Sequence, residues 1–505
     1  MNISINITYI GYFIIPLAFI VLIFKPQYLI TLLISVSVLH ASSVLNGSIN
    51  NFQYGLSPYY FVAICILLRL LNILLSHRNL LVINSNMKYF TYILLVFWMW
   101  SVISAFLLPY LFQGVEVYNP RLGLDLQYKH HATLEWTFSN LAQAIYLTLN
   151  MAVIIYAFLI DENHSLYYVR IGIKLAIIIV CFLGIWQVLS SYLILQFPYN
   201  IINNNISYYQ GYNQYIGSIR RLVSSFAEPS YAGAYLASIE VGLLSVYLNN
   251  SLSKNKQITL FIVILVIFSL LIQTFATTGY LSLLIGNIIL LFKYKPFYRS
   301  RKSIYTRKWL YCFISYIIIL LIISFCITIS YKHANINNVE DIHAGYTENV
   351  EDIHAGYTVN EGSVSVIGKL FSSALIKDTK SDSFVHRTAA DIYAFTIFIS
   401  TYGLGAGLGS SRSSSLIPTL LSTIGIIGVT SFIMLIYSVI RRIIKIHCDK
   451  YSNICNYIYW SLLTLLIAHC ISIPDISFPP LWISIITYVT VDKCCYNNTI
   501  NKILR

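Results

Sequence analysis

Long apolar runs recur along the whole chain, and they constrain its fold more than any other feature. The 505-residue sequence is 57% hydrophobic and only 10% charged. A helix needs about 20 apolar residues to cross the hydrocarbon core of a bilayer, which is roughly 30 Å thick. Runs of this kind occupy residues 7–24, 28–45, 58–75, 89–108, 139–160, 171–195, 230–249, 257–276, 279–293, 309–330, 416–440, 456–473 and 478–491. We therefore expect an all-α, polytopic membrane protein with about 12–13 transmembrane helices, forming a single domain over residues 1–505.

The basic residues predict how these helices are oriented. The formal net charge is +13, which by itself is compatible with a nucleic-acid partner. Most of the charge is gathered in the loops 254–256, 293–308 and 441–450. Loops rich in Lys and Arg stay on the cytoplasmic side of a membrane, so the charge indicates topology instead of nucleic acid. The loops expected on the outer face are then 109–138, 196–228 and 331–415.

The loop 331–415 is the largest soluble part of the chain, and we expect it to carry short helices. Its apolar run 388–402 is predicted to lie on or dip into the outer surface, because a crossing there would move the loop 441–450 to the outer face. A tandem duplication occupies 338–358 and contains Glu-Asp-x-His twice. These residue types ligate metals, but a short duplication is typical of a tolerant surface loop. We expect neither a metal site nor a cofactor.

A first charged segment stands directly before an apolar run. Arg220 and Arg221 begin the sequence Arg-Arg-Leu-Val-Ser-Ser-Phe-Ala-Glu-Pro-Ser-Tyr-Ala-Gly, which contains Glu228 and Pro229. Charges at the mouth of a membrane helix are costly and indicate function. Pro suits the first helical position, the free N–H groups of a first turn attract anions, and arginine matches phosphate oxygens. The segment predicts a phosphate site on the outer face; an Arg–Glu pair that anchors lipid headgroups is the alternative.

A second charged segment ends the large loop. His386 and Arg387 precede Asp391, and a helix there places Arg387 and Asp391 one turn apart on one face. They are followed by Gly403, Gly405, Gly407, Gly409 and Arg412. Such glycines allow a close backbone approach to a ligand, or they form a flexible turn into the next span. The glycines follow no predicted strand, which excludes a dinucleotide-binding fingerprint.

Glu240 is the conspicuous charge inside a predicted span, near the middle of 230–249. An intramembrane carboxylate must face the interior and find a partner. It is either the carboxylate of a proton-coupled transporter or a hydrogen-bonded structural residue. We expect the remaining polar residues of the spans to be packing or interface groups: His40, Gln273, His469 and Asp475.

The two charged segments resemble those of the bacterial O-antigen polymerase (Wzy) and O-antigen ligase superfamily. The resemblance rests on an Arg-x-x-(small)-x-Phe-x-Glu-Pro-Ser-x-x-(Ala/Gly) segment at 220–233 and on a late-loop arginine followed by a Gly-x-Gly turn at 387–409. An apolar helix containing Gly425-Ile-Ile-Gly428 follows that turn. The order of the spans and the large late loop extend the resemblance over nearly the whole chain.

The resemblance implies a multi-pass protein of the bacterial inner membrane that transfers glycans on the outer face. The donor would be a glycan on undecaprenyl pyrophosphate. A polymerase transfers it to a new lipid-linked repeat unit of O-antigen or capsule, and a ligase transfers it to lipid A–core. The expected partners are these lipid-linked glycans and membrane lipids, with a chain-length regulator protein as a further candidate.

The charged residues suit such a transfer. The first outer loops contain no Asp-x-Asp metal motif, so fixed arginines are expected to stabilise the pyrophosphate leaving group: Arg220, Arg221, Arg387 and Arg412. The candidates for the base are His386, Glu228 and Asp391. An imidazole titrates near neutral pH, and His386 resembles an important late-loop histidine of the ligases. We expect a metal-independent, inverting polymerase; the alternatives are the ligase and, in another class, a lipid-linked oligosaccharide flippase or proton-coupled transporter.

Overall fold

The structure is a bundle of long helices accompanied by small antiparallel sheets. The computed structural model describes residues 3–49, 52–76, 87–118, 131–160, 162–191, 195–207, 211–216, 219–249, 252–294, 307–323, 382–445 and 451–503. The helices are α1 (Tyr9–Phe24), α2 (Leu29–Val36), α3 (Pro58–Ser76), α4 (Lys88–Leu111), α5 (Phe138–Leu159), α6 (Glu162–Ser190), α7 (Tyr199–Ile202), α8 (Pro229–Leu248), α9 (Lys254–Gln273), α10 (Thr277–Tyr294), a helix over 307–323, α13 (Asp382–Ser400), α14 (Leu416–Lys445), α15 (Ser452–Ser472) and α16 (Pro479–Ile503). Of the predicted loop 331–415, the part from residue 382 onward is described, and the duplication at 338–358 lies outside the described residues.

Within the described part of the chain, nine helices are long and apolar enough to cross a membrane: α3, α4, α5, α6, α8, α9, α10, α14 and α15. They confirm the prediction of a helical protein with many apolar spans. The two N-terminal helices are shorter, since α1 has 16 residues and α2 has only 8. The last helix, α16, has 25 residues but is not among the nine.

The predicted span 28–45 does not form one helix. After a 3-10 turn at Pro26–Tyr28, α2 ends at Val36, and the chain continues as a buried irregular segment to residue 44. Polar residues in this segment bond to other loops instead of continuing the helix. The Ala41 amide donates to the Ser225 carbonyl at 2.9 Å, and the Ser42 hydroxyl donates to the Ile202 carbonyl at 2.6 Å. Irregular backbone of this kind is tolerated at membrane depth where protein surrounds it.

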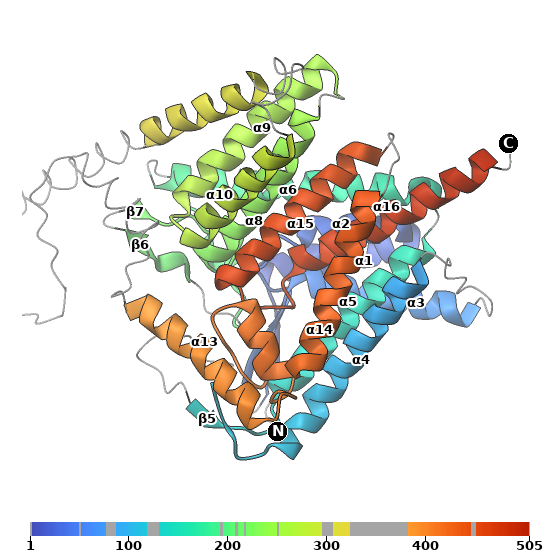
Figure 1. Cartoon of the computed structure of the whole chain (residues 1–505), viewed down its shortest axis with the longest axis vertical. Helices are drawn as coiled ribbons and strands as arrows, with labels where there is room; N and C mark the ends of the chain where they lie inside the picture. Colours follow the sequence, from blue (N-terminus) through green and yellow to red (C-terminus); the bar gives the residue numbers. More distant parts are fainter. Residues whose placement is uncertain are drawn as a thin grey trace, which may run out of the picture.

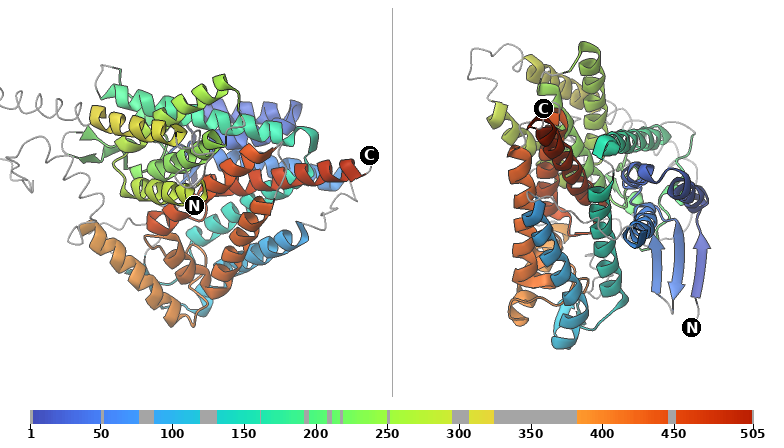
Figure 2. Two further views of the ribbon diagram at one scale, coloured as in Figure 1. Left: turned by 45° about the horizontal axis from the view of Figure 1, so that its top comes forward. Right: turned by 90° about the vertical axis from the view of Figure 1, so that its right-hand side faces the viewer.

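Small sheets were not predicted from the sequence. The largest has the order β1-β2-β3, with both pairs antiparallel. The strands are β1 (Ile3–Ile7), β2 (Leu45–Ile49), β3 (Phe52–Leu56), β4 (Glu116–Tyr118), β5 (His131–Thr133), β6 (Tyr215–Ile216) and β7 (Ile219–Arg220). Figure 2 shows β1, β2 and β3 as a layer beside the helices. Apolar and polar residues alternate in β1, but residues 4–7 are exposed on both faces, with Ile5 62% and Ile7 46% exposed.

Helix α8 is the centre of the bundle, because 18 of its 20 residues are buried. It packs against α9, α10 and α15. Small residues allow the close approach: a Cβ on Gly279 would lie 2.9 Å from the Gly233 backbone. Packing of backbone on backbone is the usual way in which membrane helices associate. We call the end of the bundle where α8, α10 and α16 begin and α9 and α15 end the site end.

Helix α13 contains most of the run 388–402 and is not among the nine apolar helices. It packs against α14 and β4. In Figure 1, α13 lies along the lower left margin and the C-terminal end of α16 lies at the upper right. Helix α14 is broken at Gly425 (φ 62°, ψ −164°), a break that the predicted span 416–440 did not anticipate.

The glycine-rich turn before α14 fits against this break. The Ala406 and Gly407 amides donate to the carbonyls of Ser422 and Thr423 at 2.8 and 2.7 Å. Gly405 has φ +84°, and a Cβ there would lie 2.5 Å from the Thr423 carbonyl oxygen. The close backbone approach that the glycines permit is therefore made to α14.

We expect Gly405→Ala to destabilise the protein, because it adds both left-handed strain and a backbone clash. The strain alone costs roughly 1–2 kcal/mol. The matched control is Gly403→Ala, which has φ +79° but whose Cβ would meet nothing closer than 3.5 Å. The measurement is the midpoint temperature of the detergent-solubilised protein. Equal midpoints for the two variants would contradict the packing of this turn on α14.

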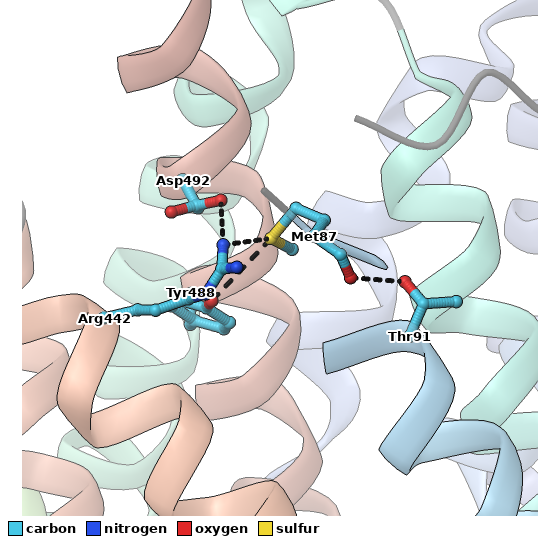
Figure 3. A network of polar contacts seen from close by, with 5 residues as sticks. All are labelled: Met87, Thr91, Arg442, Tyr488 and Asp492. Atoms are coloured by element: carbon cyan, nitrogen blue, oxygen red, sulfur yellow. Dashed lines mark hydrogen bonds and ion pairs between the residues drawn. The ribbon is translucent and has the colours of Figure 1, made fainter. Parts of the chain in front are cut away.

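A polar network ties α4, α14 and α16 together at the end of the bundle opposite the site end (Figure 3). The Arg442 guanidinium lies 3.4 Å from the Asp492 carboxylate and donates to the Met87 sulfur at 3.3 Å. Tyr488 donates to the same sulfur at 3.7 Å. Arg442 belongs to the basic loop that predicts the cytoplasmic face, so this charge also has a structural partner.

Arg442→Ala should lower stability by roughly 1–3 kcal/mol, because it leaves the largely buried Asp492 carboxylate without its cation. Arg441→Ala is the control, since the neighbouring Arg441 is exposed and surface substitutions usually stay within about 0.5 kcal/mol. Thermal unfolding in detergent measures both. The role of the pair is refuted if Arg442→Ala unfolds at the same temperature as Arg441→Ala.

Candidate functional site

The segment that enters α8 runs through the interior of the bundle without being helical. The Gln187 side-chain oxygen accepts from the amides of Val223 and Ser224 at 3.1 and 2.7 Å. Ser224 has a positive φ of 53°, and the Ser225 hydroxyl donates to the Val38 carbonyl at 2.7 Å. Buried backbone groups need such partners. These bonds fix the path of the chain and hence the position of Arg221.

Arg221 is held by the turn between α9 and α10. Its Nε donates to the Thr274 carbonyl at 3.1 Å and its Nη2 donates to the Phe275 carbonyl at 2.9 Å. Its Nη1 donates to the Gln214 side chain at 2.7 Å. A guanidinium has five N–H donors, so these three bonds orient the group and leave further donors for an anion.

The surroundings make Arg221 an unusual arginine. Burial is the main reason that its pKa is lowered to about 10; Tyr280 and Glu228 oppose this shift, and the charge of Arg387 contributes to it. Two cations within electrostatic reach of each other are unfavourable unless an anion accompanies them. Arg221 and Arg387 are 166 positions apart, since 387 − 221 = 166. The structure therefore brings together the two segments that the sequence singled out.

Arg220 belongs to a different environment. Its guanidinium lies over the rings of Tyr199 and Tyr215, at 4.6 and 5.1 Å from the centroids. Its Nε also donates to the Tyr215 hydroxyl at 2.9 Å. The sequence grouped Arg220 with Arg221, but Arg220 is the last residue of β7 and lies against tyrosine rings, whereas Arg221 follows the strand and bonds to the turn between α9 and α10.

Arg387 lies near the start of α13 and reaches the end of α15. Its Nη1 donates to the Ser472 hydroxyl at 2.5 Å. The adjacent His386 is half-buried on the same helix. This contact joins the large loop to the site end of the bundle, close to the turn between α15 and α16.

That turn contains an acidic residue whose role the sequence did not indicate. The Tyr231 hydroxyl, in the first turn of α8, donates to Asp475 Oδ2 at 2.5 Å. The Tyr231 ring stacks on His40 with centroids 5.0 Å apart. The charges of Asp475, Glu228 and Arg412 all act on the Tyr231 hydroxyl. The Tyr231 hydroxyl thus lies within electrostatic reach of both acidic groups and of Arg412.

Asp391 has a different set of neighbours from the other predicted site residues. Its carboxylate accepts hydrogen bonds from the Ser413 and Ser414 hydroxyls, from the Ser414 amide at 2.9 Å and from the Ser415 hydroxyl at 3.1 Å. These serines directly precede α14. The arrangement is typical of a capping carboxylate and leaves little capacity for a substrate proton.

Glu240 lies within α8, and Glu228 lies at its N-terminal end. Glu228 is the residue before the helix, and it accepts from the Ser230 hydroxyl at 3.3 Å. Glu240 is fully buried and accepts hydrogen bonds from Tyr316 and, at 3.5 Å, from Asn287. Two donors from neighbouring helices satisfy a buried carboxyl group, which favours the structural interpretation of Glu240.

The sequence predicts Asp475 and His40 to be packing or interface groups. Asp475 follows Ile473 and Pro474, in the break between two apolar runs. An acidic residue in so short a break is a signal that distinguishes it from other interface residues. His40 carried a weaker signal, because only the structure shows that α2 ends before it.

Within the described part of the chain, no group of three or more His, Cys, Asp or Glu is arranged to hold a metal ion. The helices define the class of the protein: it is a multi-pass membrane protein. Comparison with protein-family models, with curated proteins and with solved structures gives no match to this chain.

We expect Asp391→Asn to lower stability by roughly 1–3 kcal/mol, because an amide offers one acceptor oxygen in place of two. Glu116→Gln is the matched carboxylate-to-amide control, as the Glu116 side chain is 64% exposed and lies 3.7 Å from His131. Midpoint temperatures in detergent compare the two variants. A stable but inactive Asp391→Asn protein would favour a catalytic role for Asp391 over a capping role.

Proposed function

We propose that this protein is a membrane glycosyltransferase that polymerises undecaprenyl-pyrophosphate-linked repeat units of O-antigen or capsule. The observation that carries the proposal is the convergence of Arg221, Arg387 and Arg412 with Glu228 and Asp475 at the site end of α8. The first three residues provide cations for a pyrophosphate. The two acids provide candidate proton acceptors. A resemblance of the sequence motifs to the polymerase and ligase superfamily supports the same conclusion.

The arginines suit a leaving group that carries its own charge. A departing lipid pyrophosphate needs fixed positive charge where its negative charge develops. Arg221 is fixed by three hydrogen bonds and Arg387 by its bond to Ser472. Donors that are already oriented need no rearrangement during the reaction. The proposed mechanism is a metal-independent, inverting single displacement.

The proposal also fixes an orientation. The site end would face outward from the inner membrane of a bacterium, with about 12–13 spans in all. The basic groups at the opposite end, among them Arg442, would then lie in the cytoplasm. A chain-length regulator protein remains a proposed partner.

The closest rival is the ligase, which shares the donor and therefore the arginine cluster. The two are separated by the acceptor, a lipid-linked repeat unit for the polymerase and lipid A–core for the ligase. Glu240 gives no specific support to a flippase or proton-coupled transporter, because the Glu240 carboxyl group accepts hydrogen bonds from Tyr316 and Asn287.

Arg387→Ala and Arg412→Ala should each lower chain elongation by about 10²–10³-fold, because each removes charge that stabilises the leaving group. Arg220→Ala, whose guanidinium lies against Tyr199 and Tyr215, should retain long chains. The measurement is the length of surface polysaccharide in source cells carrying each variant, at matched membrane expression.

Single-repeat material with Arg387→Ala and Arg412→Ala supports the polymerase. Long chains that accumulate on undecaprenyl pyrophosphate when activity is lost indicate the ligase instead. Precursors trapped on the cytoplasmic side indicate a flippase. Normal chain lengths in both arginine variants would refute the assignment of the site.

A further inference from the structure

The turn between α15 and α16 is fixed from three sides. The Trp482 indole donates to the Ile476 carbonyl at 2.8 Å, and the Tyr60 hydroxyl donates to the Ser477 carbonyl at 2.7 Å. A ring nitrogen of His469 lies 2.9 Å from the Ile473 carbonyl oxygen. Helices α3, α15 and α16 thus hold the backbone on both sides of Asp475. A side chain on such a support keeps a constant direction.

The Asp475 carboxylate is oriented through one of its oxygens. Tyr231 donates to Oδ2 at 2.5 Å, and the Tyr231 ring is itself packed between His40 and Phe478, with centroids at 5.0 and 5.3 Å. Among the described residues, Oδ1 accepts no hydrogen bond. Asp475 is half-buried, so Oδ1 is positioned and available to a ligand.

The other carboxylates of the site are less suited to accept a proton. Asp391 already accepts four hydrogen bonds from the turn before α14. Glu228 stands at the N-terminus of α8 and within the field of Arg221. Glu228 is therefore already a partner of a cation, and it also accepts a hydrogen bond from the Ser230 hydroxyl at 3.3 Å.

We propose that Asp475 is the general base of the glycosyl transfer and that Tyr231 is its positioning residue. This inference rests on the proposed function. Asp475 Oδ1 takes the proton of the acceptor hydroxyl, and the acceptor oxygen forms a bond to the anomeric carbon. The bond from that carbon to the pyrophosphate oxygen breaks, and its electron pair leaves with the pyrophosphate. The proton on Asp475 then passes to water, which restores the carboxylate.

The titratable and charged groups around this carboxylate come from several elements. They are His40 in the segment after α2, Glu228 and Tyr231 at the start of α8, Arg412 in the turn before α14, and His469 in α15. The test therefore compares variants at Asp475 and Tyr231 alone.

Purified protein in nanodiscs is supplied with lipid-linked repeat units extracted from source cells that lack the protein. Asp475→Asn should lower kcat by about 10²–10⁴-fold, because the amide accepts no proton. KM and the binding of undecaprenyl pyrophosphate should change by no more than about threefold, since the arginines remain. Glu116→Gln, on β4 and outside the site, should retain wild-type kcat.

Tyr231→Phe keeps the ring against His40 and removes the hydrogen bond to Asp475. The acidic limb of the pH dependence of kcat/KM should move to higher pH, because the hydroxyl no longer stabilises the ionised carboxylate. A role of Tyr231 in packing alone would leave that limb in place. If Asp475→Asn is not recovered folded, the pH profile of Tyr231→Phe tests the roles of Asp475 and Tyr231.

The outcomes separate the base from the function on which it rests. If the wild-type protein lengthens chains but Asp475→Asn stays within about threefold of its kcat, Asp475 is not the base and the polymerase stands. An unshifted profile in Tyr231→Phe likewise overturns the role of the pair. If the wild-type protein lengthens no chains, the proposed function is wrong and the role of Asp475 falls with it.

Discussion

The path of the chain into α8 depends on hydrogen bonds that a helix would have supplied for itself. In a membrane interior, each backbone amide that lacks a hydrogen-bond partner destabilises the fold by roughly several kcal/mol. Gln187 of α6 satisfies two such amides at once, those of Val223 and Ser224. Serine hydroxyls join the same segment to the irregular chain after α2. The arginine cluster is therefore supported by polar side chains that never meet a ligand.

Arg221 both bonds to the end of a helix and places a positive charge at the candidate site. Its bonds to the carbonyls of Thr274 and Phe275 satisfy acceptors at the C-terminal end of α9. The same charge lies within reach of Arg387 and Glu228. An arginine bound to backbone carbonyls keeps its full charge, because the carbonyls carry only partial charges. The helix end thereby orients a cation without neutralising it.

The sequence predicted the helical class well, because apolar runs of membrane length are local signals. It also singled out Arg221 and Arg387 as candidates for binding the same pyrophosphate, and the charge of Arg387 acts on Arg221 in the structure. It did not separate Arg220 from Arg221, because Arg220 lies against tyrosine rings whereas Arg221 bonds to backbone carbonyls more than 50 positions away. It also missed Asp475, whose contact with Tyr231 spans 244 positions. Contacts at such separations leave no pattern in a single chain.

Contacts between distant positions also explain why the sequence placed Asp391 among the candidate bases. Its spacing from Arg387 was visible in the sequence, but its bonds to Ser413, Ser414 and Ser415 were not. The break in α14 at Gly425 was hidden as well, because a glycine within an apolar run is also compatible with a continuous helix. The sequence thus identified Asp391 and Gly425 as notable residues but did not identify the groups that they contact.

The bonds of Asp391 have a geometric consequence for the two arginines of the large loop. Arg387 lies one helical turn before Asp391, and Arg412 directly precedes Ser413, which donates to the same carboxylate. The two cations are therefore separated by a short rigid path through one side chain, although 24 residues lie between them along the chain. The hydrogen bonds of Asp391 thereby constrain the distance between the two positive charges. A ligand with two negative groups would be selected by the spacing of those groups as well as by their charge.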